Sequence, residues 1–188
     1  MREGDKPTES LEWFAKAIGV LAAVYEREPG NVYARQNLGI SYWNRAVAHD
    51  RLEKYAEAIT DWDKAIELSP KDEQSRIRAA RAISRIRAGQ LDQGVAEVAE
   101  LAKSPNTSGA EWYDLACAYA VASGKVADKK DEYATRALEL LRQAVKAGYK
   151  DAAHMKTDID LDALRDRDDF KKLVAELDVK AAGEKKGK

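Results

Sequence analysis

The chain has 188 residues, of which 45% are hydrophobic and 35% are charged, a composition that suits amphipathic helices and is too apolar for a disordered chain. With 32 basic and 33 acidic residues, it has no global field that would attract nucleic acid or an anionic membrane. We find no hydrophobic leader and no run of about 18 apolar residues, so we expect a cytoplasmic protein with no membrane span. A single cysteine, Cys117, excludes an internal disulfide.

Helical periodicity dominates the chain from the first segment onward. Phe14, Ile18, Leu21 and Tyr25 recur at three- and four-residue steps, which indicates one buried helix face. Prolines 29, 70 and 105 separate long helix-compatible stretches, because proline cannot continue a helix interior. The pattern predicts helices over residues 11–27, 32–52, 54–68, 72–88, 91–103, 110–123 and 130–146, then brief helices ending with 168–177. No segment has strand patterning, so the predicted fold class is all-α.

Two segments carry a shared pattern of small and large apolar residues. The first contains Leu38, Gly39, Tyr42, Tyr55, Ala58, Trp62, Ala65 and Pro70, and the second contains Trp112, Leu115, Ala116, Tyr119, Ala137, Leu141 and Ala144. Both resemble the tetratricopeptide repeat, a helical hairpin of about 34 residues. The small residues let the two helices approach closely, while the large ones fill the remaining gaps.

This resemblance implies a right-handed α-solenoid of antiparallel helix hairpins, with about three and a half repeats. We expect a single domain over residues 10–177, made of a lone helix (10–29), a repeat (31–70), a degenerate repeat (71–105), a repeat (108–148) and a C-terminal cap (149–177). Residues 1–9 and 178–188 are expected to be flexible. Relative to the family pattern, about two helical turns are inserted between Tyr42 and Tyr55, and again between Tyr119 and Ala137.

The order of the segments is also similar to repeat regions that follow the catalytic domain of some bacterial serine/threonine protein kinases. None of the kinase motifs is present, so no kinase chemistry is implied. The chain is then expected to be a recognition region, either detached or part of a larger protein.

The resemblance places several residues on the concave side of the first helix of each hairpin, where the family binds peptides. Tyr33, Gln36, Trp43, Asn44 and Tyr113 are therefore candidate peptide-binding residues, since aromatic anchors dominate such interfaces. Trp43 and Tyr113 have a second interpretation, in which they pack against neighbouring helices. The sequence leaves both open.

Five arginines occupy the helix predicted over residues 72–88. Three of them, Arg78, Arg81 and Arg85, share one side of this helix. One interpretation is a groove for an acidic peptide, since guanidinium groups bind carboxylates in bidentate fashion. The other is that the arginines flank the buried strip and pair with acids of neighbouring helices, such as Asp61 or Glu97.

Catalytic, cofactor and metal signatures are not found in the sequence. Cys117 lies between small apolar residues, which is typical of a buried packing cysteine. Asp158, Asp160 and Asp162 imitate a calcium loop, but Ala163 stands where that loop needs glycine. We therefore expect Asp158 or Asp160 to cap a helix, with Leu161, Leu164 and Phe170 packed on the end of the solenoid.

The predicted function is a non-catalytic scaffold that binds another protein or peptide, with an acidic segment as one candidate, and no nucleic acid or membrane. The alternative is a structural or self-association module. In either case we expect a monomer or a weak homo-oligomer.

Overall fold

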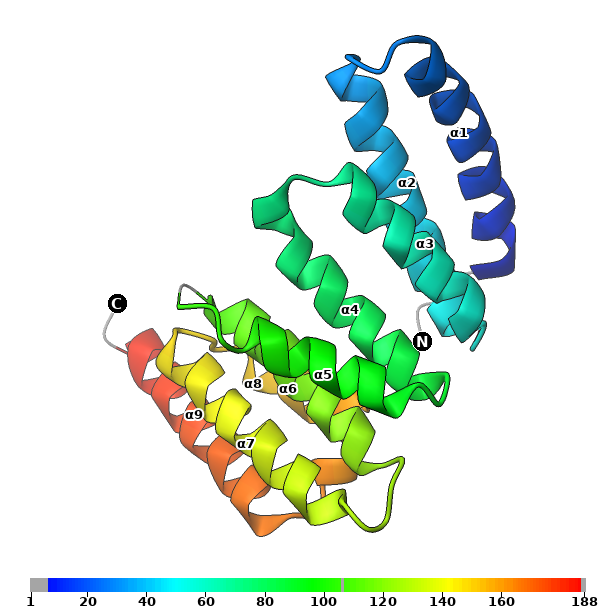
Figure 1. The fold of residues 1–188 in the computed structure, drawn as a ribbon. Helices are drawn as coiled ribbons and strands as arrows, with labels where there is room; N and C mark the ends of the chain where they lie inside the picture. The colour runs from blue at the N-terminus through cyan, green and yellow to red at the C-terminus, as the bar shows by residue number, and fades with distance from the viewer. Residues whose placement is uncertain (1–6, 106, 187–188) are drawn as a thin grey trace.

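The computed structural model describes residues 7–105 and 107–186, and every regular element in these ranges is helical (Figure 1). The elements are α1 (Pro7–Arg27), α2 (Val32–Arg51), α3 (Tyr55–Leu68), the 3₁₀ helix η1 (Lys71–Glu73), α4 (Gln74–Arg87), α5 (Leu91–Leu101), α6 (Gly109–Ser123), α7 (Lys130–Lys146), α8 (Ala152–Thr157), the 3₁₀ helix η2 (Ile159–Leu164) and α9 (Asp168–Lys186). The all-α prediction is confirmed. Consecutive helices pack as antiparallel pairs, as in a tetratricopeptide-like solenoid.

Local signals explain where the helices begin. The Asn31 side chain accepts a hydrogen bond of 2.9 Å from the Ala34 N–H and so caps α2. Ser108 and Glu111 form a reciprocal capping box at the start of α6. α1 begins at Pro7, since proline at the first helical position costs no hydrogen bond.

The C-terminal helix differs from the sequence-based boundary. α9 does not end at Leu177 but continues to Lys186, through a segment that contains the good helix formers Ala181 and Ala182. Residues 1–6 and 187–188 of the predicted flexible ends lie outside the described residues.

The hairpins α2–α3, α4–α5 and α6–α7 are linked because α4 packs on α3, and α6 packs on α4 and α5. Small residues make the close contacts, and Ala46, Ala58 and Ala82 are fully buried. Gly94 of α5 shows how close the helices come, because a Cβ atom there would lie 2.5 Å from Cγ1 of Ile86. Any side chain at this position would separate α4 from α5.

A buried acid on the second helix pairs with cations on the first helix in two successive hairpins. Asp61 of α3 is 2% exposed and accepts hydrogen bonds of 2.8 and 2.7 Å from Arg45 of α2. In the next hairpin Arg81 and Glu97 pair in the same way, each 36 residues after its counterpart. An equivalent internal ion pair therefore occurs in each of the first two hairpins.

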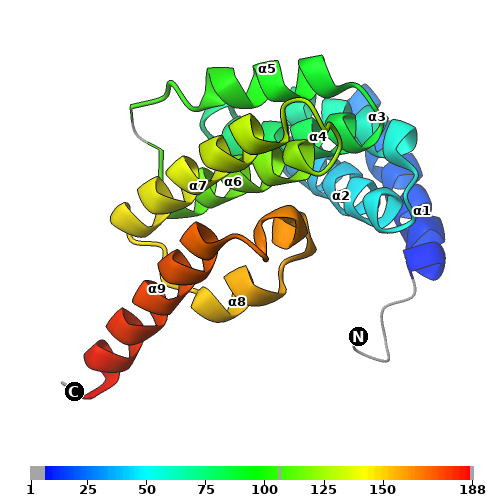
Figure 2. The same cartoon turned by 90° about the horizontal axis from the view of Figure 1, so that it is seen from below.

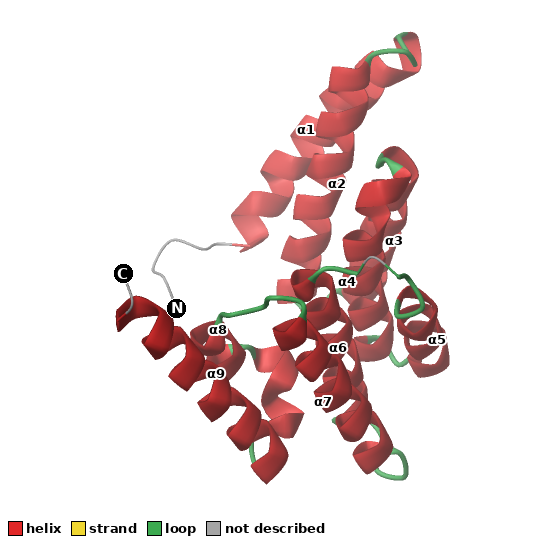
Figure 3. Cartoon of the chain, turned by 90° about the vertical axis from the view of Figure 1, so that its left-hand side faces the viewer, coloured by secondary structure: helices red, strands yellow, loops and turns green. Residues whose placement is uncertain are grey.

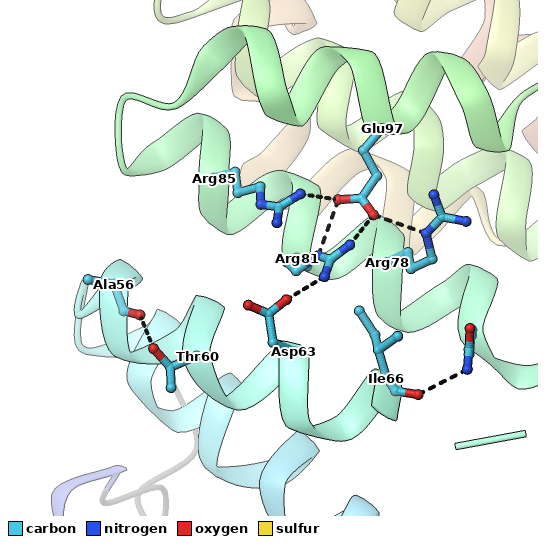
Figure 4. Close-up of polar contacts among 9 residues, drawn as sticks. Ala56, Thr60, Asp63, Ile66, Arg78, Arg81, Arg85 and Glu97 are labelled. Atoms are coloured by element: carbon cyan, nitrogen blue, oxygen red, sulfur yellow. Dashed lines mark hydrogen bonds and ion pairs between the residues drawn. The ribbon is translucent and has the colours of Figure 1, made fainter. Parts of the chain in front are cut away.

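Glu97 gathers three arginines of α4 around one carboxylate (Figure 4). Arg78 Nε lies 3.0 Å from Oε1, and Arg85 Nη1 lies 2.8 Å from Oε2. Arg81 bonds both carboxylate oxygens and also Asp63 of α3. Because Glu97 is 7% exposed, it would be an uncompensated buried charge without these partners.

A second polar network joins the first hairpin to the next. The Trp62 Nε1–H donates to Asp50 at 3.0 Å, and the Ser84 hydroxyl donates to the same carboxylate at 2.8 Å. Burial raises the pKa of Asp50, and the two donors partly offset this effect. The network ties α2, α3 and α4 together where hydrophobic contacts alone would allow sliding.

The cap packs against the C-terminal hairpin, on the side of α6 opposite α5 (Figure 2). Leu161 and Leu164 of η2 are fully buried and Phe170 of α9 is 4% exposed, which confirms that these residues pack on the solenoid end. Asp158 caps η2 by accepting from the Asp160 N–H. Asp160 in turn pairs with Arg87 of α4, so the cap is held by charge as well as by apolar burial.

Substituting the shared carboxylate should strongly destabilise the domain. We expect Glu97→Ala to lower the free energy of unfolding by on the order of 3 kcal/mol, since it leaves three clustered guanidinium groups without their common partner. Urea denaturation followed by circular dichroism measures this loss. Glu100→Ala is the matched control, because Glu100 lies on the same helix, is exposed and pairs with Lys103. Equal effects of the two substitutions would contradict this role of Glu97.

Candidate protein-binding surface

Tyr113, predicted to contact a peptide, is a core residue beneath the cap. It is 4% exposed, stacks on Tyr149 with ring centroids 4.4 Å apart, and donates a 2.8 Å hydrogen bond to Asp158. Its position on the first helix of a hairpin agrees with the resemblance, but Tyr149, His154 of α8 and Asp158 already surround its ring. The prediction that Tyr113 contacts a peptide is wrong because the cap folds back onto α6.

The three candidate arginines are also engaged within the molecule. Arg78, Arg81 and Arg85 all bond Glu97, the arrangement expected by the packing interpretation of their sequence pattern. The side chain of Arg78 is the most open of the three, at 34% exposure. Most of their charge is therefore used inside the hairpin, and an acidic peptide would have to compete with Glu97 for it.

The remaining candidates lie on one open surface of α2. We define the α2 face as the exposed residues Val32, Tyr33, Gln36, Ile40 and Asn44. Tyr33 is 74% exposed and Ile40 is 57% exposed, unusually high values for large apolar side chains. The face contains no charged residue, and charge depletion with aromatic enrichment is typical of the centre of a protein interface.

Trp43 forms the edge of the α2 face. Its ring is half-buried and meets Trp62 edge-on, with centroids 5.7 Å apart and planes at 73°. The guanidinium of Arg76 lies 6.0 Å from the Trp43 ring centroid and 3.5 Å from Asp114 of α6. Trp43 thus both packs internally and borders the open surface, combining the two interpretations that its sequence position allows.

Sequence reasoning missed a second exposed stripe, on α1. Among the described residues, eight large hydrophobic side chains are exposed, and six of them lie on α1 and α2. The three on α1 are Trp13, Val20 and Val24, which we call the α1 stripe. The signal was present, because α1 has apolar residues on more than the one face that packs on α2.

The surroundings of the Cys117 thiol oppose its ionisation. Its side chain is 3% exposed, and burial together with the nearby carboxylates of Asp158 and Asp160 raises its pKa. A thiol held in the protonated form is a poor nucleophile. Within residues 7–105 and 107–186, no group of three or more acid, histidine or cysteine side chains is placed to hold a metal ion. None of the helices described is long and apolar enough to span a membrane.

A separate hollow lies between α5 and α7, with a volume of about 860 Å³. Its walls include Val95 and Tyr133 and carry both acids and bases, such as Asp92 and Arg136. The hollow opens broadly to solvent, and its charges do not converge on one point. It therefore offers no chemistry comparable to the α2 face.

Comparison with known families supports the resemblance seen in the sequence. Residues 39–72 match the family model of the tetratricopeptide repeat. This match supports the presence of a tetratricopeptide repeat at these residues. A search of curated proteins and a search of solved structures gave no match. Nothing in these comparisons links the chain to bacterial protein kinases.

The match revises the register of the first repeat. It spans 34 residues, the usual length of the repeat, and starts at Gly39 within α2. No insertion between Tyr42 and Tyr55 is then needed. The extra turns of α2 lie before the matched span, from Val32 onward, and they carry Tyr33 and Gln36. The open surface is therefore built largely on the part of α2 that extends beyond the repeat.

The pKa values of two carboxyl groups, Asp114 of α6 and Asp160 of η2, are raised by their surroundings. Burial raises the pKa of Asp114 and of Asp160 to about 6 in each case, while Arg76 and Arg87 partly oppose the shift. In the unfolded chain the pKa of each of these carboxyl groups is near 3.8. The folded state therefore binds more protons between these pH values, and stability must fall as pH rises through this window.

We expect the thermal midpoint to be higher at about pH 5 than at about pH 7.5, with the pair contributing on the order of 2 kcal/mol to the difference. Asp114→Asn/Asp160→Asn should shrink this difference, whereas Asp128→Asn/Asp166→Asn, at two exposed acids, should leave it unchanged. Differential scanning calorimetry across the pH range gives both values. An equal pH response of the wild type and the buried-site variant would refute the assignment.

Proposed function

We propose that the chain is a non-catalytic protein–protein interaction scaffold that holds a partner polypeptide on the α2 face. The observation that carries this proposal is the uncharged, aromatic surface of Tyr33, Gln36, Ile40 and Asn44, bordered by Trp43. Tetratricopeptide repeats generally mediate contacts with other proteins, and the matched repeat includes Ile40, Trp43 and Asn44. Exposed apolar patches of this kind mark interaction sites.

The chemistry of the α2 face favours a partner segment with apolar anchors. Gln36 and Asn44 offer amide donors and acceptors that can pair with the backbone of a peptide, while Tyr33 and Ile40 supply contact area. Arg76 beside Trp43 adds one cationic group at the edge, partly neutralised by Asp114. The three arginines of α4 bond Glu97 of α5 and are not needed as direct contacts.

A photo-reactive residue at Asn44 tests this proposal. In a lysate of the source organism we expect it to cross-link a partner polypeptide, and Tyr33→Ala/Gln36→Ala should reduce the yield about tenfold or more, because anchor residues dominate binding. The same photo-reactive residue at Gln143, exposed on α7, serves as the control position. Equal yields and the same products from both positions would contradict binding at the α2 face, and products that contain only this chain would favour the structural alternative.

A further inference from the structure

The α1 stripe and the α2 face lie on neighbouring helices at the N-terminal end of the molecule, where α1 and α2 are side by side (Figure 3). Side-chain contacts orient both helices. On α2, Gly39 faces α3, since a Cβ there would lie 3.3 Å from Cβ of Leu68. On α1, Ile18 packs in one cluster with Leu38 of α2 and Leu68 of α3, so it marks the buried side of α1.

Helix geometry then places both exposed stripes on the opposite flank. At about 100° per residue, Trp13, Val20 and Val24 point roughly 120° or more away from Ile18. Tyr33 and Ile40 likewise point roughly 100° or more away from Gly39. Both stripes therefore point away from the buried side of their own helix. The combined surface therefore contains six of the eight exposed large hydrophobic side chains of the described residues.

We propose that this α1–α2 surface binds the same surface of a second copy of the chain, forming a dimer that competes with the partner on the α2 face. The competition rests on the proposed function, whereas the dimer itself does not. A two-fold axis parallel to the helices would lay α1 of each copy against α2 of the other. Every neighbouring pair in the resulting four-helix bundle is then antiparallel, the arrangement of up-down bundles.

The size of the surface is sufficient for a second copy. Each helix of about 20 residues is about 30 Å long, and packed axes lie about 8–10 Å apart. The pair therefore covers on the order of 500 Å² per copy, or about 1,000 Å² in total, which reaches the threshold for a specific interface. Either helix alone would fall short of this area, so the dimer requires both stripes.

The charge pattern also favours a second copy. The α2 face is uncharged, whereas Lys16 of α1 lies 4.9 Å over the Trp13 ring, close to the α1 stripe. Packing α1 against α2 of the second copy opposes this cation to the uncharged residues of the α2 face. The net charge of −1 adds almost no repulsion between copies.

Sedimentation velocity of the full chain over a wide concentration range tests the dimer. We expect a reversible monomer–dimer equilibrium, and Trp13→Glu/Val20→Glu should raise the dissociation constant at least about tenfold, because it places four acids in the interface core. Ile159→Glu/Val179→Glu is the matched control, since these side chains are 71% and 72% exposed on η2 and α9. The control should dimerise like the wild type, and circular dichroism should show that both variants are folded.

Two outcomes overturn the proposal. One is a wild type that stays monomeric at every concentration, and the other is a dimer that survives Trp13→Glu/Val20→Glu. Neither outcome affects the cross-linking result at Asn44, since Trp13 and Val20 lie outside the α2 face. Competition is measured in the same variant, in which cross-linking of the partner should rise relative to the wild type. Unchanged or reduced cross-linking there would reject the competition while leaving the dimer intact.

Discussion

The pairing of a buried acid with cations of the facing helix is the interaction on which the first half of the solenoid depends. Asp61 with Arg45, and Glu97 with the arginines of α4, fix how the two helices of each hairpin face one another. Breaking such a pair is costly because the remaining charge stays buried. The same pairing occupies three arginines of α4, which otherwise would form a strongly basic surface on that helix.

In the third hairpin an apolar residue occupies the position of the buried acid. Leu140 follows Ala137 at the spacing by which Asp61 follows Ala58 and Glu97 follows Gly94, and it is 2% exposed. A hydrophobic residue there needs no partner charge, so the α6–α7 core continues without interruption into the cap. The solenoid is therefore ionic within its first two hairpins and largely hydrophobic in the third.

The molecule has a covered end and an open end. At the C-terminal end, η2 packs on α6 and α9 packs on α7, while Tyr149, His154 and Asp158 surround Tyr113. At the N-terminal end no described element covers α1 and α2, and their apolar side chains face solvent. A repeat array needs its terminal units shielded, since each unit buries its apolar surface against a neighbour. Both proposed contacts would bury the apolar side chains of this open end.

The sequence by itself determined the helices, the repeat resemblance and a capping role for Asp158 or Asp160, because periodicity, proline positions and small-residue spacing act over short distances along the chain. It offered Glu97 as one possible partner of the arginines, but neither its sharing by three of them nor the burial of Tyr113 against the cap could be read from it, since both join segments far apart in the sequence. The α2 face was partly predicted, through Tyr33, Gln36 and Asn44, but its continuation onto α1 was not. Which apolar stripe remains exposed is set by the neighbours that a helix acquires on folding, and only the tertiary structure decides this.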